Sequence, residues 1–280
     1  MGQTLLLDRH AVRKRGRGAL RLPSLSPLRR FVSPVVLVLA WEALSRAGVI
    51  PATIIAAPSA ILATAWDLMR TGELGENLLV SLARVAAGFV IGAAAGAALA
   101  LVAGLSRLGE DIADAPMQML RTLPHLALVP LFILWFGIGE LPKVALVALV
   151  ALGAAFPVYL NLFAGLRGVD PKLIEAARVF GLGRLALIRR VMLPGALLSL
   201  LVGLRYALGV SWLTLVVAEQ IAAASGIGHM INDARDFLRT DIIVVGLLVY
   251  ALLGLGADAL VRAVERRALR WRPGNMGALR

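Results

Sequence analysis

The stretch IEAARVFGLGRLALIRRVMLP, residues 174–194, is a charged segment placed between two long apolar segments. It carries four arginines and one glutamate, and its pattern is helical on both sides of a central glycine. Just before it, Asp170 and Pro171 form a helix start, because aspartate accepts from free first-turn amides and proline loses no hydrogen bond there. The sequence therefore predicts a helix from about Pro171 to Phe180, a left-handed residue at Gly181, and a second short helix.

The rest of the chain has the composition of a membrane protein. Its 280 residues are 59% hydrophobic and 16% charged, with a mean hydropathy of +0.83, whereas soluble domains are about one quarter charged. Six apolar runs approach the roughly 20 residues that a helix needs to cross a bilayer. They are Val32–Ala47, Val85–Leu105, Leu123–Gly139, Val144–Leu166, Gly195–Ala218 and Ile242–Val264. We expect the insert to join the fourth span to the fifth, with Pro194 opening the fifth.

Arginine and lysine predict the orientation of these spans. Eight lie in residues 1–30, six in residues 167–190 and six from residue 262 onward, and the opposite connections have far fewer. Because basic residues favour the cytoplasmic side, both termini and the insert are predicted to be cytoplasmic. We divide the chain into an Arg-rich cytoplasmic tail (1–30), a membrane domain (31–265, with the insert at 167–194) and a cytoplasmic C-terminal tail (266–280). This distribution explains the net charge of +12 without nucleic acid.

The second span carries a ladder of small residues. Gly88, Gly92, Gly96, Ala100 and Gly104 follow one another at four-residue steps. Small residues at this spacing let another helix approach closely, and that contact stabilises helix pairs in lipid. The alternative is that glycine and alanine are simply common in membrane helices.

Several kinds of chemistry are excluded by composition. The chain has no cysteine, and its three histidines are scattered, which argues against a metal site. Its lysines, Lys14, Lys143 and Lys172, do not follow glycine, so no phosphate-binding loop is present. We therefore expect a non-catalytic chain that binds no metal and no cofactor of its own.

The insert matches a longer pattern. Glu175-Ala176-Ala177, then Gly181 and Leu193-Pro194 at fixed distances, resembles the EAA loop of the permease subunits of binding-protein-dependent ABC importers, although valine replaces the usual isoleucine at position 191. The resemblance extends from about residue 51 to residue 258. It is most specific at residues 118–140, 203–219 and 225–241, which resemble the nitrate, sulfonate and taurine branch and, within it, the aliphatic sulfonate permeases.

This resemblance implies an all-α protein of the bacterial inner membrane with six spans and the type I ABC importer (MetI-like) fold. Its partners would be a second permease copy, two ATP-binding subunits that hold ATP and magnesium, and a periplasmic substrate-binding protein. The solute would be an aliphatic sulfonate, with taurine, nitrate, another small organic anion or a thiamine precursor as alternatives. The residues implied in coupling to the ATPase are Glu175, Ala176, Ala177, Gly181 and Pro194.

Candidate pathway residues come from charges inside the spans. Arg205 lies 11 positions after Pro194, or roughly 16 Å along a helix, near mid-membrane, where an arginine usually faces a cavity or a partner. The other candidates are Arg84, Arg121, His125, Trp212 and Glu219. Structural alternatives remain open for all six: arginines paired or reaching headgroups, His125 and Trp212 packed, and Glu219 solvated. The rival functional classes are a self-sufficient channel or ion-coupled carrier, and a membrane scaffold.

Overall fold

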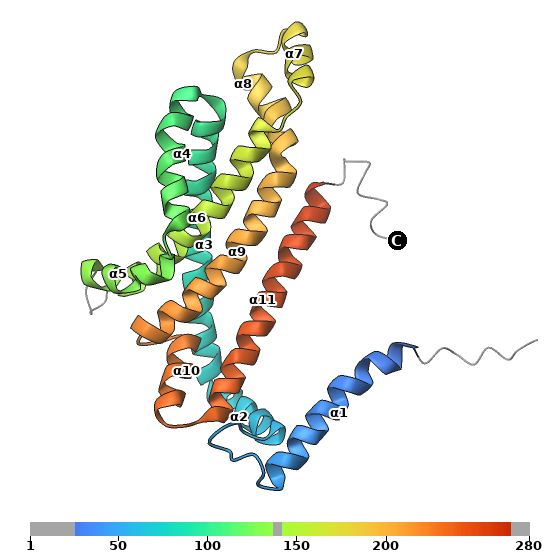
Figure 1. Cartoon of the computed structure of the whole chain (residues 1–280), viewed down its shortest axis with the longest axis vertical. Coiled ribbons are helices and arrows are strands. Elements are labelled where there is room, and N and C mark those ends of the chain that lie inside the picture. Colours follow the sequence, from blue (N-terminus) through green and yellow to red (C-terminus); the bar gives the residue numbers. More distant parts are fainter. Residues whose placement is uncertain (1–25, 137–141, 270–280) are drawn as a thin grey trace, which may run out of the picture.

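In the computed structural model, residues 26–136 and 142–269 are described, and their regular structure is entirely helical. The helices are α1 (Ser26–Arg46), α2 (Pro58–Thr71), α3 (Glu73–Leu105), α4 (Arg107–Thr122), η1 (His125–Leu128), α5 (Val129–Phe136), α6 (Pro142–Arg167), α7 (Pro171–Val179), α8 (Arg184–Leu187), η2 (Ile188–Met192), α9 (Leu193–Ala222), α10 (Ile227–Asp236) and α11 (Thr240–Ala268). Figure 1 shows the long helices α3, α6, α9 and α11 in one bundle. We call the end with α7 and α8 the insert end, and the end with α2 and α10 the far end.

Four helical segments among the described residues are long and apolar enough to cross a membrane. They are Glu73–Leu105, Val144–Arg167, Arg184–Ala222 and Thr240–Ala268. Each contains one of the six predicted spans. The prediction of an all-helical membrane protein is therefore confirmed, and four of its six spans are single long helices. The remaining two predicted spans, 32–47 and 123–139, do not coincide with any of these four long helical segments.

The first predicted span lies on α1. Charges near both ends of this helix, at Arg29, Arg30, Glu42 and Arg46, leave a short apolar centre. Helix α1 includes the residues on both sides of position 30, so the predicted boundary between tail and membrane domain falls inside it. Within the described residues α1 packs mainly against α2, and Figure 1 shows it standing away from the bundle.

The third predicted span, 123–139, is not one helix. Helix α4 ends at Thr122, and the backbone of Leu123 is extended before Pro124 and the short helices η1 and α5. Proline disfavours helical backbone at the residue before it, which accounts for the break. Residues 137–139 lie outside the described residues. The helix in this region instead begins at Arg107 and packs against α3.

Helix α3 packs against α6 along the predicted glycine ladder. A Cβ added to Gly92 or Gly96 would lie under 3.0 Å from the backbone of Ala151 or Ala155 on α6. A Cβ added to Gly104 of α3 would meet the side chain of Leu166, which also lies on α6. The ladder is therefore confirmed as a close helix contact, and the alternative that its small residues are incidental is wrong.

Replacing Gly92 with alanine is expected to lower the free energy of unfolding by about 1–3 kcal/mol, the usual cost of overpacking, because the new methyl group would press on the backbone of Ala151. The measurement is the unfolding midpoint in detergent. Gly75→Ala is the matched control on the same helix, because nothing lies within 4 Å of a Cβ at that position. Equal midpoints for the two variants would contradict the close α3 and α6 contact.

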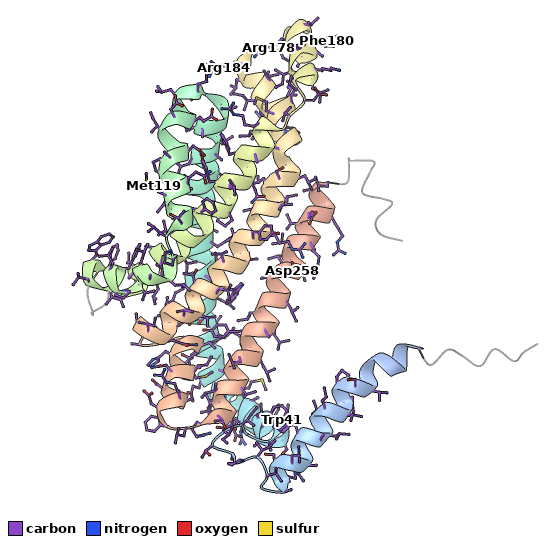
Figure 2. The ribbon with its side chains drawn as sticks, viewed as in Figure 1. Trp41, Met119, Arg178, Phe180, Arg184 and Asp258 are labelled. Atoms are coloured by element: carbon purple, nitrogen blue, oxygen red, sulfur yellow. The ribbon has the colours of Figure 1, made fainter. Side chains whose placement is uncertain are left out.

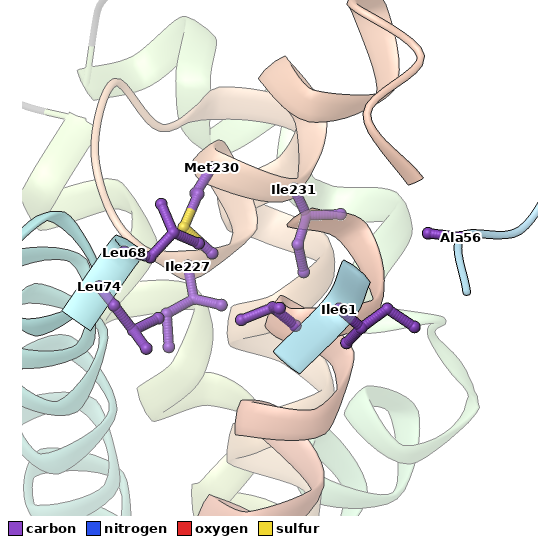
Figure 3. Close-up of a cluster of buried hydrophobic side chains, with 8 residues drawn as sticks. Ala56, Ile61, Leu68, Leu74, Ile227, Met230 and Ile231 are labelled. Atoms are coloured by element: carbon purple, nitrogen blue, oxygen red, sulfur yellow. The ribbon is translucent and has the colours of Figure 1, made fainter. Parts of the chain in front are cut away.

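A buried apolar cluster fixes the far end of the bundle. Figure 3 shows side chains from α2, α3 and α10 meeting there, and Val245 of α11 belongs to the same cluster. The members are Ala56, Ile61, Leu68, Leu74, Ile227, Met230, Ile231 and Val245. Asp241, in the first turn of α11, also accepts a hydrogen bond of 2.7 Å from the Thr64 hydroxyl of α2. The far-end part of α11 is therefore held on two sides.

Candidate functional site

The insert has the predicted start and turn. The Asp170 carboxylate accepts from the Lys172 amide at 2.9 Å, which caps the first turn of α7. The helix ends near Phe180, and Gly181 takes the left-handed conformation with φ +78°. The Leu182 amide then donates to the Ala177 carbonyl at 3.1 Å. This turn reverses the chain and places α8 beside α7.

The second helix of the insert differs from the prediction. Helix α8 passes through the π-helical turn η2 into α9, so residues 184–222 form one continuous helix of 39 residues. Pro194 therefore does not open a separate helix. Proline has no amide hydrogen and crowds the preceding turn, and a π-helical turn just before it relieves that conflict. The insert is thus joined to α9 without a break in the helix.

The tip of the insert exposes apolar side chains among arginines. Val179 and Phe180 are 86% and 84% exposed. Figure 2 shows Arg178, Phe180 and Arg184 gathered at the insert end. Of the predicted coupling residues, Glu175, Ala176 and Gly181 are exposed, whereas Ala177 is buried. Ala177 packs within the chain, whereas the exposed large apolar side chains of the insert are Leu173, Val179, Phe180 and Leu185.

Two of the predicted pathway residues form a buried ion pair at the far end. The Arg84 Nη1 atom of α3 lies 2.7 Å from Glu219 Oε1 of α9, and the side chains are 8% and 0% exposed. Arg84 also donates to the carbonyl and hydroxyl oxygens of Ser225, at 2.6 and 3.0 Å. The interpretation of Arg84 as an arginine that reaches lipid headgroups is therefore wrong.

The Glu219 carboxylate accepts hydrogen bonds from three further donors, which lie on α3, α10 and α11. The donors are the Ser81 hydroxyl at 2.8 Å, the Gly228 amide at 3.1 Å and the Tyr250 hydroxyl at 3.2 Å. Such partners offset the cost of burying a charge. The alternative of a solvated Glu219 is wrong, because this carboxylate joins α3, α10 and α11 to α9. We call Ser81, Arg84, Glu219, Ser225 and Tyr250 the far-end cluster.

Arg205 lies in a different place, in a groove of about 1000 Å³ between α9 and α11. Its Nε atom is 2.7 Å from Asp258 Oδ1 of α11, and its side chain is 51% exposed. Trp212 lines the same groove, and its ring packs edge-on to Tyr250 at a centroid distance of 6.5 Å. Arg205 is thus paired, as the structural alternative predicted. Its side chain remains partly exposed and lines the groove.

The six candidate pathway residues do not form one site. Arg84 and Glu219 lie in the far-end cluster, Arg205 and Trp212 line the groove, and the side chains of Arg121 and His125 lie outside the described part of the structure. Sequence reasoning missed Ser81, Tyr250 and Asp258 as partners. All three are polar side chains on otherwise apolar helices, and this feature marks residues with a partner or a function in membrane segments.

Comparison with known proteins gives a consistent result. A family model described as "Binding-protein-dependent transport system inner membrane component" matches residues 77–270. Two relatives carry the name "Putative aliphatic sulfonates transport permease protein SsuC". The one from Bacillus subtilis is 45% identical over 239 residues, covering 85% of this chain and 86% of the relative. The one from Escherichia coli is 48% identical over 240 residues, covering 86% and 90%.

A solved structure also shares the fold. A chain from an amino acid ABC transporter superposes with a TM-score of 0.60 at 21% sequence identity. The match covers 71% of this chain and 96% of that chain. At this level of sequence identity, the similarity shows that the two chains share the same arrangement of helices.

Proposed function

The chain belongs to the family of binding-protein-dependent transport system inner membrane components, and from this we propose that it is the permease subunit of an ABC importer for aliphatic sulfonates. The observation that carries the proposal is the identity of 45% and 48% to two aliphatic sulfonate permeases over 85% and 86% of the chain. In this role the chain binds no cofactor or metal, and ATP is hydrolysed on a separate subunit.

The proposed assembly has the insert end in the cytoplasm. Its six spans are the four long helical segments together with α1 and the broken α4, η1 and α5 segment, so both termini are cytoplasmic. Two copies of the chain enclose the pathway. Two ATP-binding subunits act at the insert end, and a periplasmic binding protein delivers the solute to the far end. The arginine-rich termini and the arginines of the insert support this orientation, because basic residues favour the cytoplasmic side.

In this proposal the insert is the EAA loop, and its tip docks on the ATP-binding subunit. The exposed Val179 and Phe180 support this role, because large apolar side chains surrounded by polar ones are typical of protein interfaces. The continuous helix from α8 into α9 carries a displacement of the docked tip into the membrane. Arg205 is placed on α9 and opens on the groove, where its guanidinium suits a sulfonate group.

The test is uptake in proteoliposomes that contain this chain, its ATP-binding subunit and its binding protein. Radiolabelled ethanesulfonate should accumulate only with internal ATP and with the binding protein present. Parallel assays with labelled taurine and nitrate separate the alternative solutes. Uptake of taurine or nitrate without ethanesulfonate would overturn the solute assignment. Uptake by the permease alone, without nucleotide, would favour the stand-alone carrier and overturn the importer.

A further inference from the structure

Helix α11 is anchored at the far end and is packed more loosely along the rest of its length. Its buried residues in the described chain are Val245 and Gly246, both near the far end. A Cβ added to Gly246 would lie under 3.0 Å from Ile231 of α10, and Tyr250 bonds to Glu219 of the far-end cluster. Beyond Tyr250, toward the insert end, Leu253 and Ala257 are partly buried against α3 and α9, and the other side chains border two grooves or are exposed. We call residues 251–268, which are more loosely packed, the free part of α11.

Two grooves flank the free part of α11. The groove that holds Arg205 separates it from α9 and measures about 1000 Å³. A second groove of about 520 Å³ lies between α11, α3 and α9 and is lined by apolar side chains. Gly209 and Gly254 line the first groove and Gly256 lines the second, and a Cβ on any of them would meet nothing within 4 Å. Glycines at these positions leave room for α11 to approach its neighbours more closely than it does here.

Within the described residues, the one ion pair that spans the first groove is Arg205 with Asp258. Asp258 also accepts from Arg262, one turn further along α11, and Glu265 lines the same groove. The charges of the two arginines, Arg205 and Arg262, are balanced by those of Asp258 and Glu265. The groove therefore carries no net positive charge. An incoming anion at Arg205 therefore competes with Asp258 for the guanidinium.

We propose that Asp258 is an internal counter-ion for Arg205, that a transported sulfonate displaces it, and that this exchange releases the free part of α11 from α9. A sulfonate group offers several oxygens to a guanidinium, as the carboxylate does. The pair is partly exposed, and ion pairs that water reaches are weak enough to exchange partners. The inference rests on the proposed function, because it takes the solute to be a small anion.

The test measures the separation of α9 and α11 by pulsed electron resonance between spin labels. The chain has no cysteine, so Leu213→Cys and Leu260→Cys, both at exposed positions, supply its two labelling sites. The labelled chain is assembled with its ATP-binding and binding-protein partners in nanodiscs. Adding ethanesulfonate with the binding protein should shift the distance distribution in the otherwise wild-type chain. Asp258→Asn should show the shifted distribution without ethanesulfonate, and ATP hydrolysis without ethanesulfonate should rise several-fold.

The matched control is Glu265→Gln, which removes a negative charge from the same groove but leaves the Arg205 and Asp258 pair in place. It should respond to ethanesulfonate as the wild-type chain does. If wild-type vesicles take up ethanesulfonate with ATP but the distance does not change, the exchange is refuted and the importer stands. If they take up no ethanesulfonate at all, the proposed function fails, and the exchange fails with it. An unshifted Asp258→Asn distribution also refutes the exchange.

Discussion

Replacing Glu219 with alanine is expected to lower the free energy of unfolding by about 3–5 kcal/mol, because the change leaves Arg84 buried without its counter-charge. It also removes the acceptor for Ser81, Gly228 and Tyr250. Most soluble domains are stable by only about 5–15 kcal/mol, so a loss of this size should show as a lower yield of folded protein. The measurement is the unfolding midpoint of the purified chain in detergent.

Two further variants keep this prediction testable if Glu219→Ala does not fold. Tyr250→Phe removes a single hydrogen bond and should cost about 0.5–1.5 kcal/mol. The double variant Arg84→Met with Glu219→Leu should be more stable than Glu219→Ala, because replacing both charges with apolar side chains costs less than leaving one unpaired. Asp236→Ala at the exposed end of α10 is the control and should change the midpoint little. A Glu219→Ala midpoint equal to the control would refute the buried pair.

Features that depend on regular local spacing could be predicted from the sequence. The Asp170 cap, the left-handed Gly181 and the contact of Gly92 with α6 each follow from a few neighbouring residues, because caps, turns and helix faces have fixed periods. Pro194 shows the limit of this reasoning. Its missing amide allows either a helix start or a π-helical turn inside a longer helix, and the packing of the insert decides between them.

The pairing of charges could not be predicted, because the partners are far apart in the chain. Arg84 and Glu219 are separated by 135 positions, and each alone fits a residue that reaches the membrane surface. Asp258 likewise lies 53 positions after its partner Arg205, inside an apolar run. Composition shows that such side chains need partners inside a membrane protein, but the helix packing determines which partners meet. The far-end cluster and the Arg205 pair therefore emerge only from the fold.

The Arg84–Glu219 pair and the Arg205–Asp258 pair lie in two parts of the bundle that are packed differently. At the far end, buried and fully bonded side chains hold α3, α9, α10 and α11 together. Toward the insert end, α11 meets α9 across an open groove through a partly exposed pair. Local movement occurs most easily where buried contacts are few. A displacement that enters through α8 should therefore change the insert-end half of the bundle more than the far end.

Replacing Phe180 with aspartate is expected to weaken the binding of the ATP-binding subunit by roughly 30- to 1000-fold, which corresponds to about 2–4 kcal/mol for the loss of an aromatic anchor at an interface. Phe180 is 84% exposed at the tip of the insert, so little of its packing lies within the chain. The variant should fold normally and yet lose ATP-dependent uptake. Co-purification of the two subunits, followed by titration in detergent, measures the effect.

The matched control is Phe237→Asp at the opposite end of the molecule. Phe237 is 79% exposed, so the same substitution at similar exposure is compared across the two ends. Phe237→Asp should leave the affinity for the ATP-binding subunit unchanged, and both variants should keep the unfolding midpoint of the wild-type chain. Because the two changes add the same charge and remove the same ring, any difference in subunit binding reports the position alone. Equal retention of the ATP-binding subunit by both variants would show that the tip of the insert is not the docking surface.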